Sequence, residues 1–291
     1  MPGFPSLIPL AVLAIAASSP GAGDQEPRVV ASVGFVGSES VRHDVAGDRY
    51  LVANLGQRGE PNDGFISVLT PDLSVAELKW IEGGRDGAEL RDPLGLVVSG
   101  DTVYVADVAA VRRFDRATGA PTGSTEVPGA VRLNDLAVDD TGVVYVTDSG
   151  NNTTPGALYR ISADGEVSIF AERGAALQRP NGIAIASDGT IVHGGLGGAV
   201  LVFRDPTGRV VRERSLPTGR IDGIVALPDG VLLVASQDGH VVYRVPADPA
   251  EPPQIVARDI PIPAAIGADL GRRRLLIPQI AAASVTVVDL P

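Results

Sequence analysis

The chain of 291 residues contains no cysteine, which excludes disulfides, thiolate metal sites and cysteine nucleophiles. It has three histidines, and Lys79 is its one lysine beside 23 arginines. The 24 basic residues are outnumbered by 35 acidic ones, giving a net charge of −11, and no polybasic run is present. This balance argues against nucleic-acid binding and against an anionic membrane surface, because both need clustered cations.

Other familiar chemistry is also missing. Aromatic residues make up 4% of the chain, too few for a stacking platform for sugars or bases. No Gly-x-Ser-x-Gly elbow occurs, so a serine hydrolase of that type is unsupported. His193 lies in a strand-like segment, but a lone histidine is more often structural than catalytic. The glycine-rich run 194–198 precedes no helix that would bind a phosphate.

Glycine and proline are abundant. The chain has 35 glycines and 23 prolines, about a fifth of all residues. Long helices tolerate neither residue well, whereas turns need both. The composition therefore favours an all-β fold with many turns.

The first residues are typical of an export signal. Leu7 to Ala17 is an apolar stretch of eleven residues, too short to span a bilayer, and the small-residue run 18–23 precedes Asp24. The segment has no charged side chain, which departs from the usual basic start and leaves a simple N-terminal tail as the alternative. We expect a signal peptide over 1–23, a mature domain over 24–291, and a secreted or periplasmic protein that does not bind membranes and is taken as a monomer.

One short unit recurs six times along the chain. Its apolar strand reads YLVAN (50–54), VYVAD (103–107), VYVTD (144–148), IVHGG (191–195), LLVAS (232–236) and LLIPQ (275–279). A turn glycine precedes each strand, and further short apolar segments lie before the turn and after the strand. These glycines are Gly47, Gly100, Gly142, Gly189, Gly230 and Gly271. Each unit is therefore predicted to be a sheet of three or four antiparallel strands.

Six such units, spaced by 40 to 55 residues, predict a six-bladed β-propeller with antiparallel four-stranded blades. A β-sandwich or jelly roll would not explain the sixfold recurrence. Few residues follow the last strand pair, so we expect the N-terminal stretch Arg28 to Phe35 to supply the outermost strand of blade six. Such closure would leave no open sheet edge.

The first strand of each propeller blade lines the central channel, so residues at its start converge from distant parts of the sequence. We refer to these as the entrance residues. Four of them carry side-chain oxygens and stand eight residues before the turn glycine, whereas the apolar entrance residues of blades two and six have spacings of six and seven. In blade order the six are Glu39, Leu94, Asn134, Asn181, Asp222 and Ala264.

Two carboxylates and two amides that converge on one axis are costly to bury without a positive partner. Oxygen donors without imidazole or thiolate suit calcium, magnesium or manganese. We expect one divalent cation, with calcium favoured by an exported location and zinc less expected. Taken one at a time, however, Asn134 and Asn181 could be ordinary turn residues and Glu39 a solvated surface carboxylate.

The motifs around these positions resemble the senescence-marker-protein and gluconolactonase family, also known as regucalcin-like lactonases. The resemblance covers roughly residues 30–291 and rests on SESV around Glu39, RLND (132–135), RPNG (179–182) and IDG (221–223). It implies a six-bladed propeller with one divalent metal in the channel and hydrolysis of sugar lactones or related esters. Ser40 departs from the glycine that often follows the metal-binding glutamate, which leaves the substrate open.

By position, the resemblance implies that Glu39, Asn181 and Asp222 hold the metal and that Arg132 faces substrate oxygens. Asn134 would either support the metal ligands or contact the substrate. The resulting hypothesis is a metal-dependent lactonase or ester hydrolase. Asp222 would be both ligand and general base, and Asn134 would help to stabilise the oxyanion. The alternative is a non-catalytic exported propeller that binds a ligand or protein partner with at most a structural calcium.

Overall fold

The computed structural model describes residues 26–57 and 60–291. The predicted signal peptide, residues 1–23, lies outside the described residues. Within these ranges, no helix is long and apolar enough to cross a membrane. The secondary structure of the described chain consists of β-strands and one short 3₁₀ helix, η1 (Ala175–Leu177), which the repeat pattern did not predict.

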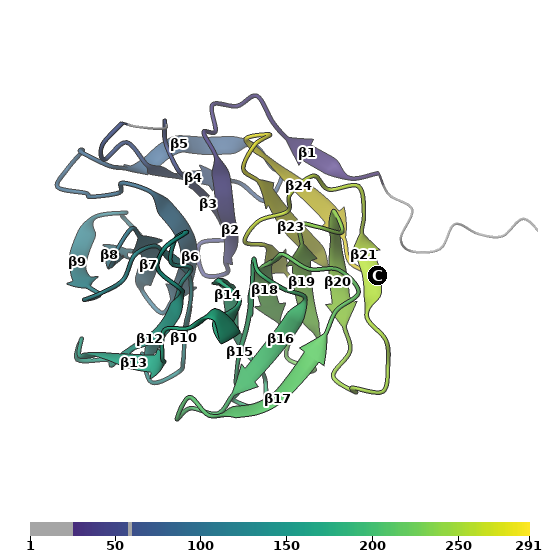
Figure 1. Cartoon of the computed structure of the whole chain (residues 1–291). Helices are drawn as coiled ribbons and strands as arrows, with labels where there is room; N and C mark the ends of the chain where they lie inside the picture. The colour runs from purple at the N-terminus through teal and green to yellow at the C-terminus, as the bar shows by residue number, and fades with distance from the viewer. Residues whose placement is uncertain (1–25, 58–59) are drawn as a thin grey trace, which may run out of the picture.

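The strands form six four-stranded antiparallel sheets arranged around a central axis, as Figure 1 shows. Blade one contains β2 (Ser38–Asp44), β3 (Arg49–Asn54), β4 (Phe65–Leu69) and β5 (Val75–Glu82). Blade two contains β6 (Pro93–Ser99), β7 (Thr102–Asp107), β8 (Ala110–Asp115) and β9 (Pro121–Glu126). Blade three contains β10 (Leu133–Val138), β11 (Val144–Asp148), β12 (Ala157–Ile161) and β13 (Val167–Ala171).

The remaining blades follow the same order from the axis outward. Blade four contains β14 (Pro180–Ile185), β15 (Ile191–Gly195), β16 (Val200–Arg204) and β17 (Val210–Ser215). Blade five contains β18 (Ile221–Ala226), β19 (Leu232–Ser236), β20 (Val241–Val245) and β21 (Gln254–Ala257). Blade six contains β22 (Gly267–Asp269), β23 (Arg274–Gln279), β24 (Ser284–Asp289) and the N-terminal strand β1 (Arg28–Val30).

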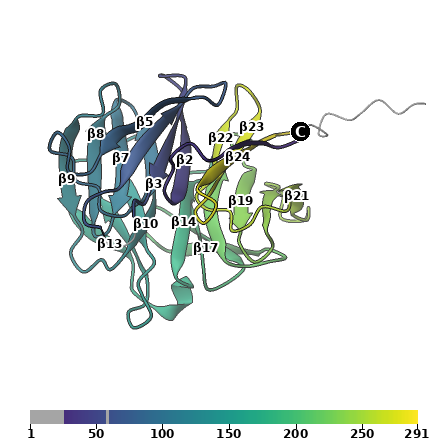
Figure 2. The same cartoon turned by 90° about the horizontal axis from the view of Figure 1, so that it is seen from above.

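The predicted six-bladed propeller is thus confirmed, and each recurring apolar segment is the second strand of its blade. The predicted closure is confirmed as well: β1 pairs antiparallel with β24, where Val29 lies opposite Thr286. Figure 2 shows the purple N-terminal segment beside the yellow C-terminal strands. The first and the last of the described strands therefore belong to one sheet, and the outer edge of β24 is covered.

The hydrophobic core is divided among the interfaces between blades. Six clusters of buried side chains occur in the described chain, and each joins two neighbouring blades. Tyr50 and Leu276, for example, belong to the cluster that joins blades one and six. Since one blade is too thin to bury both of its faces, contact with its neighbours stabilises each sheet.

The innermost strands carry a shared irregularity at the entrance residues. In blades one to five the pairing of the first strand with the second shifts around the entrance residue, as between Leu133 and Leu136 or between Ile221 and Ile224. A β-bulge of this kind redirects a side chain and interrupts the ladder. A Cβ at Gly182 would stand 1.8 Å from the carbonyl oxygen of Asp222, so neighbouring inner strands approach closely here.

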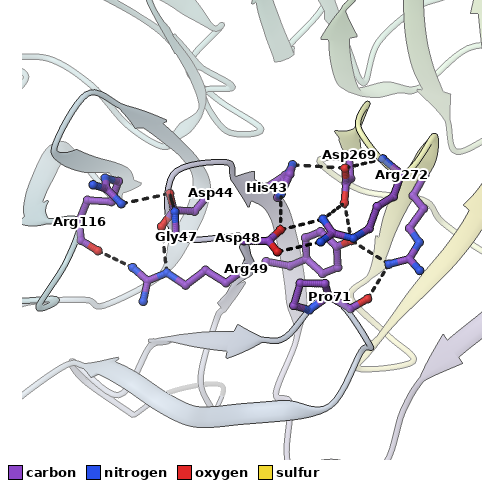
Figure 3. A network of polar contacts seen from close by, with 11 residues as sticks. His43, Asp44, Gly47, Asp48, Arg49, Pro71, Arg116, Asp269 and Arg272 are labelled. Carbon is purple, nitrogen blue, oxygen red and sulfur yellow. Dashed lines mark hydrogen bonds and ion pairs between the residues drawn. The ribbon is translucent and has the colours of Figure 1, made fainter.

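At the other end of β2, a polar network ties blade one to its neighbours (Figure 3). Asp44 accepts hydrogen bonds from Arg49 of blade one at 2.9 Å and from Arg116 of blade two at 3.5 Å. Arg272 of blade six donates to both carboxylate oxygens of Asp48, each at 2.7 Å, and to Asp269 at 3.0 Å. These contacts hold the hairpin turns together and lie away from the entrance residues.

Candidate functional site

A cavity of about 450 Å³ opens where the inner strands begin. Its walls come from three sets of positions that repeat from blade to blade, together with the loop after β11. The entrance residues in the lining are Glu39, Leu94, Asn134, Asn181 and Asp222. The positions two residues earlier contribute Arg132, Arg179, Arg220 and Ile262, and the positions just after the second strands contribute Leu55, Leu196, Gln237 and Ile280.

The four oxygen-bearing entrance residues are almost fully buried, with at most 5% of their surface exposed. Each also keeps one buried oxygen without a hydrogen-bond partner, and these atoms are Glu39 Oε2, Asn134 Oδ1, Asn181 Oδ1 and Asp222 Oδ1. Buried polar atoms are nearly always paired, because an unpaired one costs about 1–3 kcal/mol. Four such atoms lining one cavity indicate a site built to receive a ligand.

Asp222 is held by two donors on its other oxygen. Gln237 Nε2 donates to Asp222 Oδ2 at 2.6 Å, and Asn181 Nδ2 donates to the same atom at 3.2 Å. These bonds lower the pKa of Asp222, but burial and the nearby Asp135 outweigh them and raise it to about 7. Asp222 is therefore a carboxylate that is oriented by its neighbours and exchanges its proton near neutral pH.

The orientation of the Asn134 amide follows from its neighbour. Ser149 Oγ donates to the carbonyl oxygen of Pro180 at 2.7 Å, so its lone pairs must accept from Asn134 Nδ2 at 3.1 Å. The atom left for the cavity is Asn134 Oδ1, an acceptor. This arrangement suits a substrate hydroxyl or a cation, and does not supply the oxyanion donor expected from the sequence.

Glu39 completes the set from blade one. Burial, followed by the charge of Asp222, raises its pKa well above the ordinary range. Two carboxyls that resist ionisation together, beside two free amide oxygens, form a donor set that a hard divalent cation would neutralise and satisfy. In the described residues no group of three or more acidic or histidine side chains is placed for metal binding, so the amides would be essential ligands.

A buried ion pair lies nearby on the inner strands. Arg42 of β2 donates to Asp135 Oδ1 at 3.1 Å and also to the carbonyl oxygen of Ala265 at 3.0 Å. Asp135 is fully buried and directly follows Asn134. The pair joins blades one, three and six, while the charge of Asp135 contributes to the raised pKa of Asp222.

Arg132 lies at the cavity mouth with 47% of its side chain exposed, and Nη1 is 3.2 Å from Asp92 Oδ2. The expectation that the two apolar entrance residues depart from the shared register is corrected for Leu94. It lies at the same kind of bulge and lines the cavity, because blade two differs only in having a shorter hairpin turn. Ala264 precedes β22 and is absent from the cavity lining.

Sequence reasoning missed the side chains that hold the entrance residues. Gln237 and Ser149 each come directly after a second strand, in the same position of blades five and three. The sequence repeat shows that the two residues share a position, but it does not show that their side chains contact the entrance residues. His193, by contrast, does not line the cavity; its burial, followed by Arg204, lowers its pKa to about 3.

Comparison with known proteins identifies relatives with the same architecture. The sequence model of the SMP-30/gluconolactonase/LRE-like region matches residues 73–266, two thirds of the chain, which includes four of the five predicted site residues but not Glu39. No curated protein matches significantly.

Solved structures share the fold at low sequence identity. A gluconolactonase from Xanthomonas campestris is 19% identical with a TM-score of 0.68, over 91% of this chain and 90% of that one. A putative gluconolactonase is 13% identical with a TM-score of 0.69, over 92% and 93% of the two chains. Virginiamycin B lyase from Staphylococcus aureus is 14% identical with a TM-score of 0.65, over 91% and 99%. On the extent of the sequence match, the chain belongs to the SMP-30/gluconolactonase/LRE-like family.

Proposed function

We propose that this protein is a metal-dependent hydrolase of small lactones or related esters, acting at the propeller cavity. One observation carries the proposal: four buried entrance residues each keep an unpaired oxygen in the lining of the same cavity. Family membership and the two gluconolactonase-like folds support it. The cation would be calcium, or alternatively magnesium, manganese or zinc, held by Glu39, Asn181 and Asp222.

A divalent cation bound among such oxygens supplies Lewis acidity toward a carbonyl and toward water. The chain itself supplies orientation and proton transfer. Asp222, fixed through Oδ2 by Gln237, presents Oδ1, the oxygen that would also contact the cation, and can accept a proton there from a water beside it. Asn134 Oδ1 is placed to accept from a substrate hydroxyl, and the Arg132 guanidinium at the mouth can donate to substrate oxygens.

The reaction opens the lactone ring. The water oxygen bonds to the acyl carbon while one of its protons passes to Asp222, and the bond between that carbon and the ring oxygen breaks. The ring oxygen leaves as a hydroxyl after taking a proton, and the new carboxylic acid ionises near neutral pH. One proton is therefore released for each ring opened.

The proposal is tested by proton release from glucono-δ-lactone and a panel of γ-lactones and esters. The protein is first stripped with a chelator and then supplied with calcium, magnesium, manganese or zinc. We expect turnover that depends on the added cation, and loss of both turnover and cation binding in Asp222→Ala. Asp101→Asn is the matched control, because that carboxylate is 91% exposed on the hairpin turn between β6 and β7, at the opposite end of β6 from the entrance residue Leu94.

Activity of Asp222→Ala without any cation would contradict the proposal. Cation binding without turnover on the whole panel would favour the alternative function, an exported propeller that binds a ligand or partner with a structural calcium. Export itself is tested by expressing the full chain and sequencing the N-terminus of the mature protein, which we expect to begin near Asp24.

A further inference from the structure

Three arginines stand in equivalent positions around the cavity mouth. Arg132, Arg179 and Arg220 each lie two residues before the entrance residue of blades three, four and five, and all three line the cavity. We refer to them as the arginine rim. The rim contrasts with the net charge of −11 of the whole chain. Three consecutive blades of this acidic protein thus place a cation at the mouth of a cavity whose lining also contains the carboxyls of Glu39 and Asp222.

The backbone holds the rim in the same way in each blade. The carbonyl oxygens of Arg132, Arg179 and Arg220 accept hydrogen bonds from the backbone N–H just after the second strand, at 2.9, 3.0 and 3.0 Å. Arg179 and Arg220 also have positive φ angles of 54° and 52°. Residues other than glycine seldom adopt this conformation, and it occurs often at binding sites. The rim is therefore fixed in position rather than part of an unstructured loop.

The three guanidinium groups differ in the ion pairs and hydrogen bonds that they already form. Arg132 is paired with Asp92 at 3.2 Å. Arg220 donates to Gln237 Oε1 at 2.9 and 3.2 Å, and Asp238 is 3.7 Å away. Over residues 26–57 and 60–291, Arg179 has no acidic side chain within ion-pair distance. It remains the cation with most capacity to bind a ligand.

We infer that the arginine rim selects a lactone or ester that carries an anionic group, a carboxylate or a phosphate. The inference rests on the proposed function and names its substrate class. Arginine presents a planar fork that matches carboxylate and phosphate oxygens. The acyl carbon would lie deep, beside the free oxygens of Asp222 and Asn181, while the anion would point outward to Arg179.

The rest of the cavity wall fits this orientation. Opposite the rim, blades six, one and two contribute apolar side chains to the lining, namely Ile262, Ile280, Leu55 and Leu94. An anionic group would find no donor from these side chains, because aliphatic groups form no hydrogen bonds. The anion is therefore directed to blades three to five, where the rim lies.

Two pairs of substrates test the inference; the first pair has nearly the same shape and differs in charge, and the second differs by one phosphate group. The first is the γ-lactone of 2-hydroxyglutarate, which keeps one carboxylate, against its carboxamide. The second is 6-phosphoglucono-δ-lactone against glucono-δ-lactone. For the pair whose anion, carboxylate or phosphate, the rim binds, we expect kcat/KM to be about tenfold higher for the charged lactone than for the neutral one, corresponding to about 1.4 kcal/mol. This ratio should decrease at high salt.

Arg179→Gln should remove most of this preference, measured as the ratio of kcat/KM for the charged lactone to kcat/KM for the neutral lactone of the same pair. Arg209→Gln is the matched control, since Arg209 is 79% exposed on an outer hairpin and loses the same charge. Equal kcat/KM for charged and neutral lactones in both pairs would overturn the inference and leave the proposed function intact. So would a preference that Arg179→Gln does not change.

A binding experiment tests the arginine rim separately if the protein proves not to be a lactonase. If no lactone is hydrolysed with any cation, the rim is judged by calorimetric titration with 2-hydroxyglutarate and with inorganic phosphate. Binding that weakens by about tenfold or more in Arg179→Gln, but not in Arg209→Gln, would support an anion site. Equal binding by the two variants and the wild type, or no binding at all, would overturn it.

Discussion

Replacing Asp222 with asparagine should stabilise the metal-free protein and abolish its response to calcium. The side chain is 1% exposed, and burial followed by the charge of Asp135 raises its pKa from 3.8 to about 7. The asparagine side chain would keep the shape and could still accept from Gln237, but it would carry no charge. The same change also removes the charge that helps to raise the pKa of Glu39.

The expected gain in stability follows from the raised pKa of Asp222. Between about pH 4 and pH 7 the folded protein holds a proton on Asp222 that the unfolded chain has released, so the free energy of unfolding falls as pH rises. The penalty is absent below about pH 4 and fully present above about pH 7. A difference of about 3 pKa units corresponds to roughly 4 kcal/mol.

Urea denaturation in the presence of a chelator measures this difference. At pH 8 we expect Asp222→Asn to be more stable than the wild type by up to about 4 kcal/mol, and at pH 4 to be close to it. Millimolar calcium should stabilise the wild type at pH 8 and leave the variant unchanged, because a cation that binds only the folded state adds to its stability. A variant less stable than the wild type at pH 8, with a chelator present, would show that burial of the ionised Asp222 carboxylate does not destabilise the protein.

Three further predictions concern the side chain of Gln237 that holds Asp222, the packing of the inner strands, and the closure of the propeller by β1. Gln237→Met should raise the pKa of Asp222, because it removes a hydrogen bond to the carboxylate. The acidic limb of the profile of kcat/KM against pH, measured between pH 5 and 9, should then move upward by about one pH unit. If the limb does not move, Asp222 is not the base. Gly182→Ala should cost about 3 kcal/mol or more in urea denaturation, since its Cβ would meet the carbonyl oxygen of Asp222 at 1.8 Å, and a neutral effect would contradict the close approach of blades four and five. Val30→Ala should cost about 2 kcal/mol by the same assay with kcat preserved in the folded protein, whereas an unchanged stability would mean that β1 does not help to hold the ring closed.

The fold was largely predictable because each blade repeats one local pattern. The turn glycines and apolar second strands are read directly from the chain, and their recurrence permits few architectures besides a propeller. The pairing of β1 with β24 was predictable from the shortage of residues after the last strand pair. The short helix η1 carries no repeating signal, and it follows from the path of one connection between blades.

The site was predictable only in part. Register placed Glu39, Asn134, Asn181 and Asp222 at equivalent positions, and all four line one cavity. The repeat does not show which atom of an amide faces the cavity, because that depends on the hydroxyl of Ser149 and on its bond to blade four. The bulges that aim these side chains inward arise from the pairing between the first two strands of a blade, which is seen only in three dimensions.

Two of the three arginines of the rim were not predicted from the sequence. Arg179 and Arg220 occupy the same register as Arg132, two residues before an entrance residue, but the family resemblance pointed to Arg132 alone. Their relation to the cavity depends on backbone hydrogen bonds and positive φ angles that appear only in three dimensions.

The proposed function requires that the free oxygens of the entrance residues converge on a cation. A crystal structure of the protein grown with millimolar calcium tests it most directly. We expect one calcium ion at about 2.3–2.6 Å from Glu39 Oε2, Asn181 Oδ1 and Asp222 Oδ1. A cavity that contains only water under these conditions, or a calcium ion bound elsewhere and not at these three atoms, would contradict it.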